Sequence, residues 1–209
     1  AVTVKFKDKL SYDTIQESWM EYSKNHWKQI RKSNMTNIIN SYLEKEYLGI
    51  GYNINYLTGL VAFLEMILAN EEWDKCNHIP LENGTLDLDS MKIIPHSPYD
   101  KLTWQLPYKY NPQATCQPII NWLNESVGGD KKQVELLRAY LNAIITCRVD
   151  LQRYLELIGR GGTGKGTFIR LAEMLVSEKN THVTELKRLE NSPFETSKIY
   201  GKHLILITD

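Results

Sequence analysis

The stretch from Tyr154 to Ile169 reads YLELIGRGGTGKGTFI and decides how the second half of the chain is interpreted. It begins with the apolar run Tyr154 to Ile158, turns through a glycine-rich segment and continues into a segment of helical apolar period. That order predicts a strand, a phosphate-binding loop and a helix. The pattern G-x-x-x-x-G-K-[ST] is met from Gly159 to Lys165, except that Gly166 stands where a hydroxyl is usual and Thr167 follows it.

The residue types in this loop suit a nucleoside triphosphate. Backbone N–H groups can wrap the phosphates only where no side chain intrudes, and glycine leaves that space. The start of the following helix adds free N–H groups and a partial positive charge, and Lys165 adds a full charge for the β- and γ-phosphates. The alternative is a glycine-rich turn without a ligand. The residues expected to bind ATP are Gly159, Arg160, Gly161, Gly162, Thr163, Gly164, Lys165, Gly166 and Thr167.

Two residues are candidates for holding Mg²⁺. The ending Gly164-Lys165-Gly166-Thr167 resembles the loop of adenylate kinases, in which the second residue after the lysine places its hydroxyl on the metal, and this resemblance points to Thr167. The run from His203 to Thr208 has the composition of a fully buried parallel strand. Asp209 follows it roughly forty residues after the loop, where P-loop ATPases place a carboxylate on Mg²⁺.

The composition is that of a globular protein with a net charge of zero. A length of 209 residues allows one large domain or two small ones, and 25 basic side chains balance 25 acidic ones. A nucleic acid would therefore have to be bound by a local basic surface. Cys76, Cys116 and Cys147 lie far apart and are interpreted as free thiols of a reducing compartment, and Cys76 with His78 lacks the second pair that a metal site needs.

The chain shows neither a signal peptide nor an apolar run of about 18 residues. We therefore expect an intracellular, cytoplasmic protein with no membrane partner.

The N-terminal region has the apolar period of amphipathic helices. We predict helices over Ser11 to Arg31, Met35 to Tyr47 and Asn53 to Ala69. Thr14 and Glu17 have the spacing of a capping box at the start of the first helix. Three such helices with short links predict a helical bundle over residues 1–72.

Two features of this region bear on DNA binding. An aromatic stripe would suit stacking on bases, but a helix face turned toward the core explains it better. Its members are Trp19, Tyr22 and Trp27. A small basic cluster would suit a phosphate backbone, but a solvated helix end explains it better. Its members are Lys24, Lys28, Arg31 and Lys32.

The chain changes character after residue 72, where prolines and an Asn-Gly pair interrupt the helical period. The segment from Leu86 to Ile94 predicts a small β-hairpin. Helices are predicted over Pro118 to Val127 and, capped by Asp130, over Val134 to Cys147. A further strand is expected near His182-Val183.

Several short motifs, in this order, resemble the primase–helicase replication proteins of phages, plasmids, mobile elements and large DNA viruses such as poxviruses. In that family a helical domain precedes a superfamily 3 helicase core of AAA+ type. The resemblance covers the chain from about Trp73 onward, and residues 1–72 fit the helical domain only in type. The motifs are Asn83-Gly84-Thr85-Leu86-Asp87-Leu88, Pro95-His96-Ser97-Pro98, Tyr110-Asn111-Pro112, Trp122-Leu123, the loop from Gly159 to Phe168, and Pro193-Phe194-Glu195-Thr196 followed by Gly201-Lys202 and the strand from Leu204 to Asp209.

The resemblance implies ATP-driven unwinding of single-stranded or forked DNA at a replication origin by a ring, usually a hexamer, with a primase domain as a further partner. It implies catalytic roles for Lys165, on the β- and γ-phosphates, and for Asp209, which would orient Mg²⁺ and the attacking water. Thr167 would share the Mg²⁺. A neighbouring subunit's arginine would complete each site and sense the γ-phosphate.

The predicted fold is mixed: an α-helical domain with a small β-hairpin, followed by the start of a P-loop α/β parallel sheet of AAA+ type. We divide it into a helical bundle (1–72), a hairpin-and-helix remainder of the helical domain (73–150) and the first part of an ATPase core (151–209). The family's DNA-gripping loop, sensor strand and arginine finger would lie beyond Asp209, and the second acid usual in its Walker B motif is not seen. A sheet without its middle strand exposes apolar faces and edges, so we expect a fragment that does not unwind DNA alone.

Two other functions stay open. The Gly164-to-Thr167 ending also fits a nucleotide kinase. Such kinases usually have the loop near the N-terminus and an arginine-rich lid after it, whereas here more than 150 residues precede the loop and Arg170 and Arg188 are the only arginines that follow it. The helical region also fits a non-catalytic DNA-binding or oligomerisation module.

Overall fold

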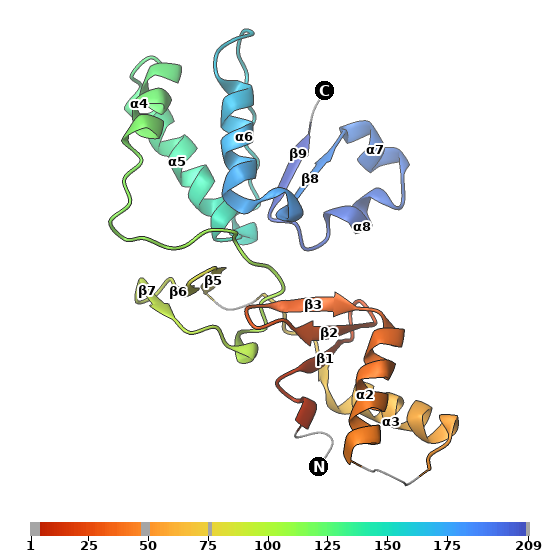
Figure 1. The fold of residues 1–209 in the computed structure, drawn as a ribbon. Coiled ribbons are helices and arrows are strands. Elements are labelled where there is room, and N and C mark those ends of the chain that lie inside the picture. The colour runs from red at the N-terminus through yellow and green to blue at the C-terminus, as the bar shows by residue number, and fades with distance from the viewer. Residues whose placement is uncertain (1–4, 47–50, 75–76, 208–209) are drawn as a thin grey trace. The chain divides into compact units, whose positions relative to one another are not determined.

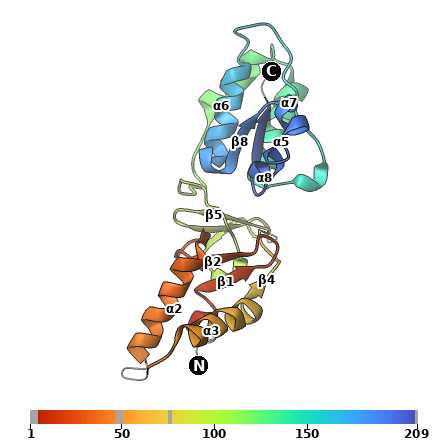
Figure 2. The same cartoon turned by 90° about the vertical axis from the view of Figure 1, so that its right-hand side faces the viewer.

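The computed structural model describes residues 5–46, 51–74 and 77–207. The chain divides into two compact units, residues 1–105 and residues 106–209, and each has its own apolar core. Figures 1 and 2 show the elements of each unit. The three-part division at residues 72 and 150 stays a prediction.

The first unit is built on a four-stranded sheet of order β3-β2-β1-β4. The strands are β1 (Leu10–Asp13), β2 (Ser18–Tyr22), β3 (Trp27–Ile30) and β4 (Ala69–Asn70). The first three are antiparallel, and β4 pairs with β1 in parallel. Helices α2 (Lys32–Glu46) and α3 (Ile54–Ile67) pack on this sheet through one apolar face each. The buried core consists of Phe6, Leu10, Trp19, Met35, Ile39, Leu43, Leu57, Val61, Leu64 and Leu68.

The helix predicted over Ser11 to Arg31 is wrong, because these residues form the antiparallel strands β1, β2 and β3. Trp19 and Trp27 are buried in the first unit, so the preferred interpretation of the aromatic stripe as core is confirmed although its secondary structure was not. The helical bundle over 1–72 is corrected to a sheet with two helices, since only α2 and α3 match predicted helices.

The predicted capping box fails for a local reason. Asp13 Oδ1 accepts hydrogen bonds from the N–H groups of Ile15 and Gln16, at 2.9 and 3.1 Å, and closes the turn between β1 and β2. A short polar side chain that binds nearby N–H groups offers the backbone an alternative to a helix. Thr14 and Glu17 therefore lie in this turn, where Glu17 has a φ of 48°.

A three-stranded antiparallel sheet completes the first unit, with β5 (His78–Leu81), β6 (Gly84–Asp87) and β7 (Lys92–Ile94). The predicted hairpin is confirmed as β6 and β7, while β5 was missed because Pro80 interrupts its pattern. The 3₁₀ helix η1 (Pro98–Asp100) leads into a segment that docks on β3. There the indole N–H of Trp27 donates to the carbonyl of Pro98, and the Lys101 amine lies 4.3 Å from the Trp27 ring centroid.

The second unit contains three long helices and a parallel strand pair. The elements are α4 (Gln117–Ser126), α5 (Lys131–Ile145), η2 (Val149–Leu151), α6 (Lys165–Val176), η3 (Glu178–Asn180), β8 (Thr181–Thr184), α7 (Leu186–Asn191), α8 (Glu195–Ile199) and β9 (Leu204–Ile207). The core joins α4, α5, α6 and β9. Its buried members are Leu123, Val134, Leu141, Ile144, Phe168, Ala172, Val176 and Leu204.

Two strand predictions in this unit need correction. Residues 152–160 take no regular secondary structure, and Tyr154 and Ile158 are 86% and 85% exposed. A strand needs a hydrogen-bonded neighbour, and in the described part of the chain β8 and β9 pair only with each other. The expected parallel strand is present as β9, but it is not fully buried: Leu204 is buried, whereas Ile205 and Ile207 are exposed.

No helix within the described residues is long and apolar enough to cross a membrane.

Candidate functional site

The glycine-rich loop ends where α6 begins. Gly164 is the N-cap of α6 with a φ of 90°, and its carbonyl accepts from the N–H groups of Thr167 and Phe168 at 3.0 and 2.9 Å. Phe168, at 5% exposure, anchors this first turn in the core of the second unit. The loop is therefore fixed to the N-terminus of a packed helix, as the sequence predicts.

Lys165 folds back across the loop. Its Nζ donates to the carbonyl oxygens of Gly159 and Arg160, at 2.6 and 2.8 Å. The Thr163 hydroxyl donates to the Arg160 carbonyl at 2.9 Å. The lysine thereby ties the beginning of the loop to its end and places a positive charge inside the curve.

Several backbone amides of the loop have no backbone acceptor among the described residues. Gly162 and Gly164 have φ values of 79° and 90°, in the left-handed region that glycine adopts without strain. Within the described part of the chain, the N–H groups of residues 161–166 donate to no backbone carbonyl. Free N–H groups in a turn that leads into a helix are the donors that bind phosphates in proteins.

Helix α4 supports the loop from one side. A Cβ atom placed on Gly164 would lie 3.2 Å from Ser126 Oγ and 3.4 Å from the ring of Trp122. Trp122 and Ser126 are four residues apart and so share one face of α4. The sequence placed Trp122 in a family motif but gave no sign that it contacts the loop, because helical spacing does not reveal which element a helix face meets.

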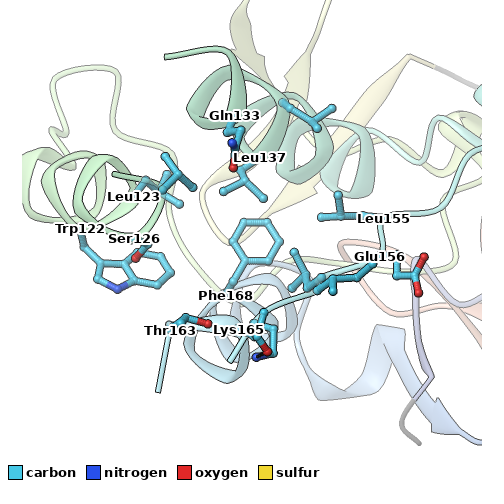
Figure 3. Close-up of a pocket in the computed structure, with 16 residues that line it drawn as sticks. Trp122, Leu123, Ser126, Gln133, Leu137, Leu155, Glu156, Thr163, Lys165 and Phe168 are labelled. Atoms are coloured by element: carbon cyan, nitrogen blue, oxygen red, sulfur yellow. Dashed lines mark hydrogen bonds between the residues drawn. The ribbon is translucent and has the colours of Figure 1, made fainter. Parts of the chain in front are cut away.

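A cavity of about 350 Å³ lies beside the loop in the second unit. Figure 3 shows side chains from α4, from α5 and from the segment before the loop arranged around it. Its walls are largely apolar, and the amine of Lys165 lies at the loop side. The wall residues are Trp122, Leu123, Val127, Leu136, Leu137, Leu155, Leu157, Ile158 and Phe168, with Ser126, Gln133, Glu156, Thr163 and Lys165 as polar members.

Of the two expected Mg²⁺ ligands, the structure describes Thr167 but not Asp209. Thr167 is exposed in the first turn of α6, and its Oγ1 accepts from Arg170 Nη2 at 3.2 Å. A hydroxyl oxygen has two lone pairs, so this bond leaves one for a cation. Asp209 lies outside the described residues, as does Cys76 of the weak Cys76–His78 pair. Among the residues that the structure describes, no three His, Cys, Asp or Glu side chains cluster as a metal site would require.

A buried carboxylate joins α8 to β8 in the same unit. Glu195 Oε1 lies 2.9 Å from His182 Nε2 and accepts from the Thr184 hydroxyl at 2.7 Å, and its Oε2 accepts from Lys198 at 2.9 Å. The hydrogen bond from His182, followed by those from Lys198 and Thr184, lowers the pKa of Glu195 to about 2. This cluster fixes α8 against the strand pair.

The basic cluster of the first unit lies on β3, on the turn before it and at the start of α2. Lys24, Lys28 and Arg31 are exposed, and Lys32 pairs with Glu65 Oε1 at 3.0 Å. These side chains face solvent, and the cluster is not the end of a long helix as the sequence suggested.

Two family models match the chain. A model described as D5 N terminal like matches residues 2–128, which is more than half of the chain, and a model described as a family of unknown function (DUF5906) matches residues 157–209. The chain is also similar to an uncharacterized mitochondrial protein, ymf21, of Marchantia polymorpha. The two are 28% identical over 147 residues, which cover 65% of this chain and 81% of that protein.

Proposed function

Because the chain belongs to the D5 N-terminal-like family, which is associated with primase–helicase proteins of phages and plasmids, we propose that it functions as an ATP-dependent DNA helicase. The family gives the replication context, and the loop around Lys165 gives the chemistry. One observation carries the proposal: a glycine-rich loop with free N–H groups, closed by a lysine, lies against an apolar cavity within one compact unit.

ATP fits this arrangement in two parts. The triphosphate needs hydrogen-bond donors and positive charge, which the free N–H groups of residues 161–166 and the amine of Lys165 offer. The base needs apolar surface, which the adjacent cavity offers. Its volume of about 350 Å³ is within the range of about 300–1,000 Å³ that proteins use for small ligands.

Mg²⁺ would be held by oxygen atoms at the helix side of the loop. We assign the hydroxyl of Thr167 and the carboxylate of Asp209 to it, because hard cations of this size prefer oxygen ligands. When bound, the ion would neutralise charge that develops on the β- and γ-phosphates. Asp209 would also orient the water that attacks the γ-phosphate.

DNA and sister subunits are the proposed partners. With no net charge on the chain, DNA would be bound by a local basic surface, for which exposed Lys24, Lys28 and Arg31 are candidates. A ring, usually hexameric in primase–helicases, would let an arginine of one subunit complete the ATP site of the next. A primase domain and a cytoplasmic or viral replication site belong to the same proposal.

Two observations favour other functions. The Gly164-Lys165-Gly166-Thr167 ending suits a nucleotide kinase, and the separate core of the first unit suits a DNA-binding or assembly module. Both make different predictions from a motor. A kinase would phosphorylate a nucleoside monophosphate, whereas a module would bind DNA or assemble without consuming ATP.

The test uses protein expressed from its complete reading frame in the source DNA. We expect ATP hydrolysis stimulated by DNA, and displacement of one strand from a forked duplex. Lys165→Ala should lower hydrolysis by about a hundredfold or more, because one positioned donor is worth that much when charge develops on a transferring group. Transfer of phosphate to a monophosphate would identify a kinase instead, and DNA binding without hydrolysis would identify a module.

A further inference from the structure

One polar group on the α5 wall of the cavity has a fixed orientation. Gln133 lines the cavity, and in Figure 3 its amide lies on the side of α5 that faces Phe168. We infer that Gln133 determines which base the site accepts, favouring a purine with an amino group at position 6 over one with a carbonyl there. This inference rests on the proposed function, in which the cavity takes the base of a nucleoside triphosphate.

The orientation of the Gln133 amide follows from its partner. Gln133 Nε2 donates to Asp130 Oδ2 at 3.0 Å. Asp130 Oδ1 accepts from the backbone N–H groups of Lys132 and Gln133, at 2.9 and 3.3 Å. The hydrogen bonds from Gln133, followed by that from Lys132, lower the pKa of Asp130, so it is ionised at neutral pH. An ionised carboxylate only accepts hydrogen bonds, so the amide nitrogen must face Asp130.

The same geometry leaves the amide oxygen for a ligand. Within the described residues, Gln133 Oε1 has no hydrogen-bond donor from the protein. At Oε1, Gln133 therefore offers an unoccupied acceptor, while Nε2 uses one of its two hydrogens on Asp130. Adenine presents a donor amine at its six-position, whereas guanine presents a carbonyl oxygen there. The amine would pair with Oε1, and the carbonyl would be repelled by it.

The size of the base distinguishes adenine from cytosine, which also carries a donor amine. The single ring of cytosine covers less of the apolar wall formed by Leu123, Leu137 and Phe168. A purine with a donor amine is therefore the best match to the walls and the polar edge together. Because a polar site rejects an analogue that cannot pair with it, we expect a preference for ATP over GTP of about tenfold.

A simpler role for Gln133 accounts for only part of this geometry. Gln133 is the third residue of α5, and Asp130 is the N-cap, so the bond between them stabilises the start of the helix. That role uses the amide nitrogen and gives no function to the oxygen. It predicts a loss of stability on substitution, with no change in base preference.

The experiment is isothermal titration of Mg·ATP and Mg·GTP into the 209-residue chain and three variants. Gln133→Leu removes the acceptor at similar size. Asp130→Asn keeps a good N-cap but no longer dictates which amide atom faces the cavity. The control is Gln117→Leu, the same change at the start of α4, where the side chain bonds Asn121 and does not line the cavity.

We expect Gln133→Leu and Asp130→Asn to reduce the preference for ATP to less than about threefold, and Gln117→Leu to leave it unchanged. Binding of both nucleotides with an unchanged ratio in the first two variants would overturn the inference. So would equal affinity of the unaltered chain for ATP and GTP, and in both cases the proposed function would stand. If the unaltered chain binds neither nucleotide, the proposed function fails, and the role of Gln133 fails with it.

Discussion

Gly164 lies against the indole ring of Trp122, so close that a Cβ atom on Gly164 would come within 3.4 Å of the ring and 3.2 Å of Ser126 Oγ. This contact joins α4 to the loop at the residue where α6 begins. The loop is thus held by its own helix on one side and by α4 on the other.

Gly164→Ala should lower the free energy of unfolding by about 1–2 kcal/mol, because the residue has a φ of 90° and a methyl group would crowd Ser126 Oγ at 3.2 Å. Gly161→Ala is the control: a Cβ there meets no atom within 4 Å, and its φ is not positive. Thermal unfolding measures both. Equal losses in the two variants would show that α4 does not confine the loop.

Thr167→Ala should remove most of the effect of Mg²⁺ on ATP affinity, whereas Thr167→Ser should keep it, because only the hydroxyl is assigned to the ion. Titrations of ATP with Mg²⁺ and with a chelator measure the difference. Thr163→Ala is a matched control in the same loop, since the proposal assigns Thr163 no contact with Mg²⁺. If Thr167→Ala responds to Mg²⁺ as the unaltered chain does, the hydroxyl is not a ligand.

Glu195 should make the second unit sensitive to acid. Its pKa is lowered from 4.5 to about 2 by hydrogen bonds from His182, Lys198 and Thr184. A carboxyl with a lowered pKa stabilises the folded state above its unfolded pKa, and this stability is lost as the pH falls from about 4.5 to about 2.

Urea unfolding at several pH values measures this contribution. Glu195→Gln should be less stable than the unaltered chain at pH 7, and the gap should narrow as the pH falls below about 4.5. Glu190→Gln, at an exposed site on α7, should show no such gap. A gap for Glu195→Gln that does not change with pH would contradict the account.

Two glycines of the first unit should respond in opposite directions to alanine. A Cβ on Gly84 would lie 2.5 Å from Ile93 Cγ2 and 2.8 Å from the Ile94 carbonyl oxygen, at a φ of 144°, so Gly84→Ala should lower stability by about 2–3 kcal/mol. Gly59 lies in α3 with open space around it, so Gly59→Ala should raise stability by about 0.5–1 kcal/mol. Denaturant midpoints test both, and a destabilising Gly59→Ala would be contrary to expectation.

The sequence predicted elements best where a local signal was unambiguous. Asp130 caps α5 as predicted, although the helix begins at Lys131 and not at Val134. Asn53, the first residue of a predicted helix, caps α3 by accepting from the N–H of Tyr56. The pair Asn83-Gly84 was interpreted only as a break in the helical period, and the strand β5 that precedes it was not predicted. The segment from Ser11 to Arg31 was predicted as a helix because its aromatic spacing fits one, while the turn at Asp13 depends on one side chain.

The candidate site was only partly visible from the sequence. The loop from Gly159 to Thr167 is a contiguous motif, so its residues and their place before α6 could be read directly. Trp122 and Gln133 come from two other helices, and only the packing of α4 and α5 brings them to the loop. The spacing of residues along the chain does not predict how these helices pack.

The central claim is that the loop around Lys165 binds ATP, and equilibrium titration of Mg·ATP tests it most directly. The measurement compares the 209-residue chain with Lys165→Ala and with Lys187→Ala, a matched change at an exposed lysine of α7. We predict saturable binding that Lys165→Ala weakens at least tenfold and Lys187→Ala leaves unchanged, since one charge-assisted contact to phosphate is worth about 1.5–3 kcal/mol. Equal affinity in all three proteins, or no binding in a folded unaltered chain, would contradict the account.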